Sequence, residues 1–582
     1  MGKRWRIHPH DAFAVQSLER SAGIPAVVAQ LLNSRGVTCP DAARLFLDAK
    51  MAGLREPDLL PGLADLADRL YSAIQNQRRI IIYGDYDADG MTSTAILYRC
   101  LQMLNANVGY HVPNRLEEGY GLNDEALRTL ATRGAQVVVT VDCGIASVGP
   151  AAVARDVGLE LLITDHHEFG PTLPAAAAIA HPRLPGSNYP FGELCGAGVA
   201  FKLAWALCQR ASQAKRVTEA LRNYLLMAIG LAAIGTIADV VPLVDENRIL
   251  VRHGLNSLRE RPPLGIAALM KLTNLTDKPA LSSEDVAFTI APRLNAAGRL
   301  NQALLGVELL TTESPERGTA LAEYIHELNN TRDSLERSIT LAASKQIKED
   351  YDVDQDPAFV LAGRGWHAGV IGIVSGRLAE KYHRPVVMIA LDPLGAKVGI
   401  GSARSANGLN LHTALAACGE HLVAHGGHAA AAGLKVEEPN LNAFRAAFCE
   451  YVASEVSDED RVSEVIIDAE APFGQLTLQT VRQIEQLAPF GQGNPRPILF
   501  AGAVKLAEPP KRMGSGERHL SLKLSQHGVQ IRGVSFGHGE WAEELAQLEG
   551  PLDVAYRPVI NDFKGRQSVE LHVVDWRPTQ KD

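Results

Sequence analysis

The sequence lacks the features of a disulfide scaffold, a cysteine metal site or a membrane protein. Its 582 residues include only seven cysteines, an odd number, and none of them is spaced as C-x-x-C. Scattered cysteines of this kind are typical of reduced thiols in the cytoplasm. No apolar run is long enough to cross a membrane, and the first residues lack the apolar stretch of a signal peptide. We therefore expect a cytoplasmic protein without membrane association.

The sequence also lacks a net positive charge and a nucleotide-hydrolysis loop. The formal net charge is −9, so basic residues must be concentrated locally if the chain binds nucleic acid. Its only Gly-Lys pair is Gly2-Lys3, so no Walker loop is present. At roughly 100 to 200 residues per domain, the length predicts about three to five domains.

An acidic turn of the form D-x-D-x-D-G is the most informative stretch of the chain. The β-branched and aromatic run Ile80–Tyr83 predicts a buried strand, and the apolar spacing of Met91–Leu104 predicts a helix. Asp85, Asp87 and Asp89 lie between them, at the end of a strand where open α/β sheets bind ligands. Three carboxylates this close repel one another unless a cation separates them, and a divalent metal is the simplest candidate.

Two other interpretations of this turn are open. The same pattern begins a calcium-binding EF-hand loop, which follows a helix and has glutamate at its twelfth position. Here a predicted strand precedes the turn, and the twelfth residue, counted from Asp85, is Ile96. A solvated acidic turn without a ligand is the remaining interpretation.

The same arrangement recurs further along the chain. Strands are predicted at Arg79–Tyr83, Val108–Val112, Gln136–Val141, Leu161–Thr164 and Ala177–Ala180, with helices at Met91–Leu104, Asp124–Thr132 and Ala146–Val157. This alternation predicts a mostly parallel sheet wound on both faces. Asp142 follows one strand, and Asp165, His166 and His167 follow another, so these side chains are expected to converge. Asp239 ends a further apolar stretch and is expected to be the fourth contribution from a strand end. Asp142 taken alone is more typical of a helix N-cap, but three strands that end in this way favour a shared site.

Beyond this sheet, the sequence predicts a long helix and a second α/β region. Ser314 and Pro315 form a good helix start, and apolar residues three and four apart continue to Asp350. A helix of this length would extend on the order of 50 Å and is typical of a connection between two domains. From Ala358 on, strands alternate with glycine-rich turns.

Several polar residues in glycine- or alanine-rich segments are candidates for binding an anion. The segment APRLNAAGRL suits close approach to an anionic ligand, although solvated arginines in a loop are an open alternative. The segment GSAR offers a hydroxyl and a guanidinium beside backbone amides, as a phosphate clamp does, and HGGH fits either a metal or phosphate contact or a plain turn. The candidates are Arg293, Asn295, Arg299, Ser402, Arg404, His425 and His428.

The last part of the chain predicts a small β-barrel. Asp458–Arg461 is a charged linker, and from Ala501 on the pattern is one of short strands with a single helix at Trp541–Leu548. Basic residues lie among aromatics such as Phe563 and Trp576, which suits single-stranded nucleic acid in a barrel of the oligonucleotide-binding (OB) type. Many acidic residues lie there too, so a generic barrel stays open.

Four motifs, GDYDADG, VDCG, TDHH and ADVVPL, resemble in this order those of the DHH phosphoesterase superfamily, whose name-giving motif is Asp165-His166-His167. The segments GWHAGVIGI, GSARS and Gly-Gly-His resemble the accompanying domain of the RecJ family of single-strand-specific 5′-to-3′ DNA exonucleases. The resemblance covers residues 60 to 575. It implies an α/β fold with an N-terminal arm at 1–55, a DHH domain at 56–305, a connecting helix at 306–352, a DHH-associated domain at 353–455 and an OB-type barrel at 460–578.

The resemblance also implies roles for individual residues. The implied ligands of one or two Mn²⁺ or Mg²⁺ ions are Asp87, Asp89, Asp142, His166 and Asp239. Asp85 and His167 would lie behind the ligands or contact the scissile phosphate and the leaving group. Ser402 and Arg404 would hold a 5′-terminal phosphate. The further phosphate contacts would be Arg293, Arg299 and His428.

The expected function is therefore metal-dependent degradation of single-stranded DNA to mononucleotides, in DNA repair and recombination. Single-stranded DNA is the expected partner, with a single-strand-binding protein and a helicase as further candidates, and we expect a monomer. Two alternatives are a DHH phosphodiesterase acting on short RNA, cyclic dinucleotides or pyrophosphate, and a non-catalytic replication scaffold. The predicted barrel argues against the first, and the full set of acids and histidines argues against the second.

Overall fold

The first α/β region is built on a five-stranded parallel sheet. The computed structural model describes residues 3–114, 118–119, 121–406, 408–457 and 462–579, so the predicted linker Asp458–Arg461 lies outside the described residues. The strands are β2 (Ile80–Tyr83), β3 (Val108–His111), β4 (Val137–Thr140), β5 (Glu160–Thr164) and β6 (Ala178–Ala180). They lie side by side in the order β3-β2-β4-β5-β6 with parallel pairings, as predicted.

Helices cover both faces of this sheet, and the strands alternate between them. Ile80 and Ile82 pack into the larger core, with α4 (Leu63–Gln75), α5 (Ala88–Met103), α8 (Gly196–Ser212) and α9 (Glu219–Ala238). Ile81 and Tyr83 face α6 (Asp124–Thr132) and α7 (Val148–Asp156) on the other side. This alternation with a period of two is what a buried strand requires.

Helix α9 corrects the expectation that no apolar run could cross a membrane. By length and composition alone its 20 residues could do so. However, 67% of its apolar window is buried inside the protein, where α9 packs against α5, α8 and α10 (Asp245–Glu260). A helix that is apolar on all sides is also what the core of a large domain contains.

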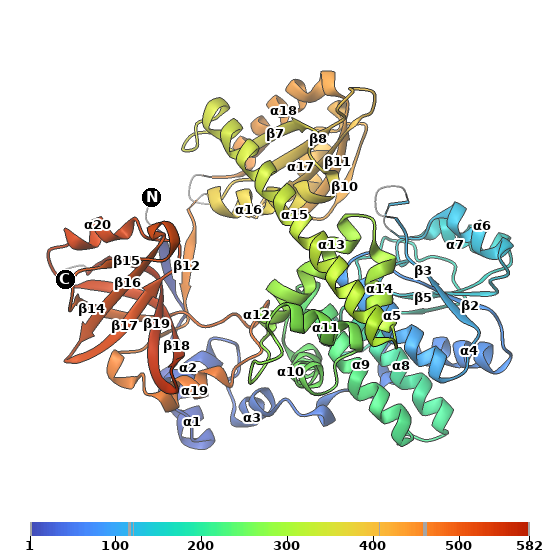
Figure 1. The fold of residues 1–582 in the computed structure, drawn as a ribbon, viewed down its shortest axis with the longest axis horizontal. Coiled ribbons are helices and arrows are strands. Elements are labelled where there is room, and N and C mark those ends of the chain that lie inside the picture. Colours follow the sequence, from blue (N-terminus) through green and yellow to red (C-terminus); the bar gives the residue numbers. More distant parts are fainter. Residues whose placement is uncertain (1–2, 115–117, 120, 407, 458–461, 580–582) are drawn as a thin grey trace.

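A 36-residue helix, α15 (Pro315–Asp350), connects the first sheet to the second, as predicted (Figure 1). The Ser314 hydroxyl accepts a hydrogen bond from Arg317 N at 3.2 Å and caps the helix. Leu321 and Ile325 pack into the first core, whereas Ile339 and Ile347 pack into the second. Before α15 lie α11 (Leu264–Leu272), α12 (Ser283–Asp285), the π-helical segment η3 (Val286–Ile290), α13 (Ala291–Arg299) and α14 (Ala303–Thr311).

The second α/β region has a mixed sheet in the order β10-β11-β9-β8-β7. Its strands are β7 (Phe359–Arg364), β8 (Val386–Leu391), β9 (Gly399–Arg404), β10 (Ala424–Gly427) and β11 (Ala431–Val436), and its helices are α16 (Ala368–Tyr382), α17 (Leu411–Ala417) and α18 (Leu441–Glu455). Helix α16 packs beside α15 on one face of this sheet (Figure 1), and Gly369 in its first turn contacts Arg299 of α13.

The C-terminal region is a β-barrel, which confirms the prediction. Its sheet runs β13-β14-β18-β19-β17-β16-β15, and an additional pairing of β14 with β16 closes it. The elements are β13 (Ala469–Glu470), β14 (Leu499–Leu506), β15 (Lys511–Met513), β16 (His519–Gln526), β17 (Val529–Ser535), β18 (Leu552–Phe563), β19 (Arg566–Pro578), α19 (Leu478–Glu485) and α20 (Trp541–Ala546).

The N-terminal arm packs against this barrel. Strand β1 (Arg4–Ile7) pairs in parallel with β12 (Glu464–Ile467), and the helices α1 (Ala12–Ala22), α2 (Ala26–Asn33) and α3 (Pro40–Asp48) contribute to the barrel core. The buried Arg248 of α10 ties both to the first α/β region, because it donates to Phe46 O at 2.9 Å and to Leu487 O at 2.7 Å.

Three segments differ from the interpretation of the sequence. APRLNAAGRL is helix α13 rather than a loop, with Pro292 in its first turn, a position that tolerates proline. GSAR is part of β9, whose backbone pairs with β8 and β11, so its amides are not exposed for a phosphate. Asp239 follows a helix, α9, and not a strand.

Candidate metal centre

Acidic side chains gather at the carboxyl end of the first sheet. Asp85 lies two residues beyond β2, and Asp87 caps α5 by accepting from Asp89 N at 2.9 Å and Gly90 N at 3.0 Å. Asp142 lies two residues beyond β4 with a φ of 63°, a left-handed conformation that is uncommon outside glycine. Strained backbone of this kind clusters at functional sites.

The N-terminus of α8 holds Asp89. The two carboxylate oxygens of Asp89 accept from Gly196 N at 2.7 Å and from Ala197 N at 2.9 Å. The positive end of the helix dipole therefore faces this buried carboxylate. Two glycines leave the space that these carboxylates occupy. A Cβ at Gly235 would lie 2.3 Å from Asp89 Oδ1, and a Cβ at Gly196 would lie 2.5 Å from Asp142 Oδ1.

The two histidines that follow β5 have opposite properties. Burial would lower the pKa of His167, but its 2.8 Å contact with Asp165 outweighs this and raises the pKa to about 9. Burial lowers the pKa of His166 to about 3, so that its ring is neutral. His166 Nε2 is buried without a hydrogen bond and lies 3.1 Å from Asp142 Oδ1 and 3.6 Å from Asp239 Oδ2. A neutral imidazole facing carboxylates is a typical metal ligand.

Asp165, which was expected to converge with the other acids, holds the two histidines in place together with His181 and Arg183, for which no role was predicted. Asp165 accepts from the backbone N–H groups of His166, at 2.7 Å, and His167, at 3.1 Å. His181 donates to His167 O at 2.9 Å, and Arg183 donates to His166 O at 2.8 Å. His181 and Arg183 follow β6 as the acids follow β2 and β4, so the same signal at a strand end could have identified them.

Seven predicted residues come together in this site. Three groups of ligand atoms each lie within 4.8 Å of one another: Asp142, His166 and His167; Asp89, His166 and Asp239; and Asp85, Asp87 and Asp142. Carboxylate oxygens combined with an imidazole nitrogen suit Mn²⁺ or Mg²⁺ better than soft metals. Asp142 and His166 each belong to two of the three groups, an arrangement compatible with one ion or with two ions that share ligands.

Burial and mutual repulsion raise the pKa of three of these carboxyls. Burial, with the charge of Asp87, raises the pKa of Asp89 to about 6. Burial and the charges of Asp89 and Asp87 raise the pKa of Asp239 to about 8 and that of Asp142 well above its usual value. Negative charge in this site therefore costs free energy, and a divalent cation would offset that cost. The electrostatics and the buried His166 nitrogen both fit a bound metal.

A second cluster lies at the N-terminal half of α16. Arg299, at the end of α13, donates to Gly369 O at 3.1 Å, and Arg404 donates to Ser402 Oγ at 3.1 Å. A Cβ at Gly372 would lie 2.9 Å from Ser402 Oγ and 3.2 Å from Arg404 Nη2. The structure thus brings the predicted Arg299, Ser402 and Arg404 to one helix.

The other two candidate phosphate contacts lie elsewhere. Arg293 is turned towards α15, where it donates to His326 Nδ1 at 3.1 Å, and it also bonds Thr289 O at 2.6 Å. His428 is exposed in the turn between β10 and β11. Helical periodicity explains why Arg293 points away from Arg299: the two residues are six positions apart and therefore lie on different faces of α13.

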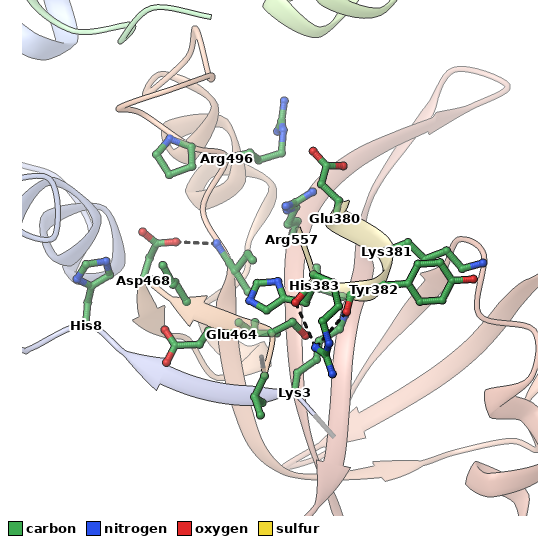
Figure 2. A pocket seen from close by; sticks show the side chains of 18 of the residues that line it. Lys3, His8, Glu380, Lys381, Tyr382, His383, Glu464, Asp468, Arg496 and Arg557 are labelled. Carbon is green, nitrogen blue, oxygen red and sulfur yellow. Dashed lines mark hydrogen bonds between the residues drawn. The ribbon is translucent and has the colours of Figure 1, made fainter. Parts of the chain in front are cut away.

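Two cavities lie next to each other along the barrel, one facing the first α/β region and the other facing the end of α16. One of about 510 Å³ is lined by Ala238 and Val240, next to Asp239, and by Phe288 and Asn295. The other, of about 780 Å³, lies between the end of α16 and the barrel and is shown in Figure 2. Both are lined by Pro495, Arg496 and Arg557, so the two cavities meet at these residues.

This fold and site define a phosphoesterase of the DHH class. The model of the DHH family, N-terminal domain, matches residues 79–229, that of the DHHA1 domain matches residues 355–454, and that of the RecJ OB domain matches residues 467–575. The chain is similar to "Single-stranded-DNA-specific exonuclease RecJ" of Bacillus subtilis, with 38% identity over 98% of this chain and 70% of that protein.

Solved structures agree with the family models. The RecJ of Thermus thermophilus in complex with Mn²⁺ has a TM-score of 0.83 and 32% identity, over 99% of this chain and 80% of that one. The Mg²⁺ complex of the same protein has a TM-score of 0.78 and 30% identity, over 99% of this chain and 79% of that one. This chain belongs to the RecJ family.

A substitution of Gly235, which packs against Asp89, tests the metal centre without changing any proposed ligand. We expect Gly235→Ala to weaken Mn²⁺ binding about tenfold or more, because its Cβ would press on Asp89 Oδ1 and on Ala197 Cβ, at 2.3 Å and 2.5 Å. Calorimetric titration with Mn²⁺ measures this. Gly149→Ala on α7 is the control, since its Cβ would meet nothing within 4 Å. Equal Mn²⁺ affinity in the two variants would contradict the assignment of Asp89.

Proposed function

We propose that this chain is a metal-dependent exonuclease that degrades single-stranded DNA from its 5′ end to mononucleotides, in DNA repair and recombination. The convergence of Asp89, Asp142 and Asp239 on His166 is the observation that carries the proposal. The family relatives bear the name of single-stranded-DNA-specific exonucleases, which supports the substrate.

The metal centre would hold one or two Mn²⁺ or Mg²⁺ ions. The proposed ligands are Asp87, Asp89, Asp142, His166 and Asp239. When bound, such ions lower the pKa of a water molecule and neutralise charge on a phosphate. His167 Nδ1 is engaged by Asp165, so the opposite ring nitrogen, Nε2, is the one that can contact the scissile phosphate. Asp85, buried behind the turn, would orient the ligands.

The cluster at α16 would read the 5′ end. Arg299, Ser402 and Arg404 combine two guanidinium groups and a hydroxyl, which suit the planar recognition of a terminal phosphate. Helix α13 connects this cluster to the metal centre, because Arg299 lies at its end and Asn295 accepts from Ala88 N in the acidic turn. The 5′ nucleotide would lie between the two clusters. Arg293 and His428 would at most contact the strand further away.

The two adjoining cavities would carry the rest of the strand towards the barrel. Arg496 and Arg557 lie where the cavities meet; Arg496 is paired with Glu284 and Glu485, so Arg557 is the guanidinium group that a passing backbone phosphate would meet. Figure 2 shows both residues on the barrel side, with Lys381 and His383 approaching from the end of α16. The barrel would bind the strand beyond them, as OB-type barrels do.

We expect the chain to release labelled mononucleotides at once from a strand labelled at its 5′ end, and only late from one labelled at its 3′ end. Removing divalent metal with a chelator should stop release from both strands, since the acidic cluster alone repels phosphate. Duplex DNA of the same sequence is the control for strand selectivity. Early release from the 3′ label, or release in the presence of a chelator, would contradict the proposal.

We further propose that the enzyme works in the cytoplasm as a monomer. The seven cysteines are all free thiols, which supports a reducing compartment. A single-strand-binding protein and a helicase are the proposed partners, because the substrate is single-stranded DNA that has to be unwound and kept unpaired.

A further inference from the structure

Two walls of the cavity next to Asp239 have an uncommon backbone conformation. Val240, which follows Asp239, has a φ of 60° and is 65% exposed. Phe288 is 77% exposed on the π-helical segment η3. A left-handed β-branched residue and a π-helical turn are both costly and both concentrate at functional sites. They flank Asn295, the polar side chain of α13 that lines the cavity.

Asn295 completes the capping of the acidic turn. Helix α5 begins with three backbone N–H groups that lack partners within the helix. Asp87 accepts those of Asp89 and Gly90, and Asn295 Oδ1 accepts that of Ala88 at 2.9 Å. Because an N–H donor faces the side-chain amide of Asn295, its oxygen must point to Ala88 and its nitrogen away from it. No hydrogen bond from this nitrogen is found among the described residues.

Asn295 lies on the same helix, α13, as Arg299, one of the residues proposed to bind the 5′-terminal phosphate. Asn295 and Arg299 are four residues apart, so they share one face of the helix about 6 Å apart along its axis. Arg299 faces the second α/β region through Gly369, whereas Asn295 lies at the metal turn and lines the cavity on the barrel side. A strand that begins at Arg299 and passes the metal centre would therefore reach Asn295 just beyond the bond that is cut.

The chemistry of Asn295 suits this position. The metal centre presents oxygen atoms of acidic side chains, which repel phosphate wherever no cation lies between. An amide N–H donor beside them can hold a phosphate oxygen without adding charge. The oxygen of the same amide keeps the acidic turn in place, so one side chain would connect the position of the strand to that of the ligands.

We propose that Asn295 is a substrate-positioning residue whose amide nitrogen donates to a non-bridging oxygen of the second internucleotide linkage, directly 3′ of the linkage that is cut. This inference rests on the proposed exonuclease function. It assigns the cavity beside Asp239 to the second nucleotide, with Val240 and Phe288 as its apolar walls.

The test uses the near-isosteric variant Asn295→Asp. Its carboxylate can still accept from Ala88 N, so the acidic turn keeps its cap, but it cannot donate to phosphate and repels it. We expect Mn²⁺ affinity, measured by calorimetry, to stay at least as high as in the wild type. We expect kcat/KM for release of the first nucleotide to fall about tenfold. Asn223→Asp is the control, on an exposed turn of α9 about 24 Å from Asp239 along the helix.

A chemical change in the substrate separates contact with phosphate from a structural effect. Strands with a single neutral methylphosphonate at the first, second, third or fourth linkage are compared with the unmodified strand. For the wild type, the neutral second linkage should lower kcat/KM about tenfold, because an interaction with a charged oxygen is lost. For Asn295→Asp, the same change should raise kcat/KM above that of the unmodified strand, because the repulsion disappears.

Three results would contradict the role proposed for Asn295 or the function on which it rests. If Asn295→Asp responds to the neutral second linkage as the wild type does, or responds only at another linkage, the inference is overturned. Loss of Mn²⁺ binding in Asn295→Asp would likewise overturn it, since Asn295 would then act through the acidic turn alone. A wild type that releases no nucleotide from the unmodified strand would refute the proposed function itself, which this design detects first.

Discussion

Asp142→Asn should lower the rate of nucleotide release from a 5′-phosphorylated strand by about 10³-fold or more. The amide keeps the size and shape of the side chain but removes the negative charge that lies 3.1 Å from His166 Nε2. Losing an anionic ligand of a divalent cation removes several kcal/mol of transition-state stabilisation, and about 1.4 kcal/mol corresponds to a tenfold change in rate. Single-turnover digestion in the presence of Mn²⁺ measures the effect. Asp156→Asn, on an exposed position at the end of α7, is the control.

The same substitution should stabilise the metal-free protein. Burial and the charges of Asp89 and Asp87 raise the pKa of Asp142, so its ionised form opposes folding. Removing that charge should increase the free energy of unfolding by about 1 kcal/mol in the presence of a chelator, seen as a higher melting temperature. Retained nucleotide release, or a lower melting temperature without metal, would show that Asp142 is not a ligand in a repulsive cluster.

Much of this site could be predicted because its logic is local and repeats at strand ends. The acids after β2 and β4 and the histidines after β5 each follow a short apolar run, and the carboxyl ends of neighbouring parallel strands meet. Asp239 lies in the predicted cluster, but it ends helix α9 and not a strand as predicted. Periodicity does not separate a buried helix from a buried strand when the residues are apolar on all sides.

The residues that were missed or misplaced depend on contacts distant in sequence. Asp165 was visible in the motif, but its hydrogen bonds to His167 appear only when the loop is folded. Glycines were read as turns, yet Gly401 lies in a central strand, where its missing Cβ leaves room for Leu434. The parallel pairing of β1 with β12 joins segments more than 400 residues apart, and no local pattern indicates such a partner. The domain boundaries proposed from the sequence stay predictions.

Gly372→Ala should abolish the preference for a 5′-phosphate, reducing it by about 100-fold, because the new Cβ displaces Ser402 Oγ and Arg404 Nη2. The measured quantity is the ratio of kcat/KM values for strands of one sequence that carry either a 5′-phosphate or a 5′-hydroxyl. Gly376→Ala lies one turn further along α16, and its Cβ would come only within 3.9 Å of Arg404 Cγ. Both changes favour the helix equally, since each replaces glycine by alanine in α16.

The two strands separate end reading from catalysis. Activity on the 5′-hydroxyl strand should be the same in the wild type and in both variants, because the metal centre is unchanged. Only the 5′-phosphorylated strand should lose rate in Gly372→Ala, whereas Gly376→Ala should keep the full ratio. If Gly372→Ala slows both strands equally, the cluster of Arg299, Ser402 and Arg404 serves the position of α16 and not the recognition of the 5′ end. An unchanged ratio would place the reader of the 5′ end on another surface.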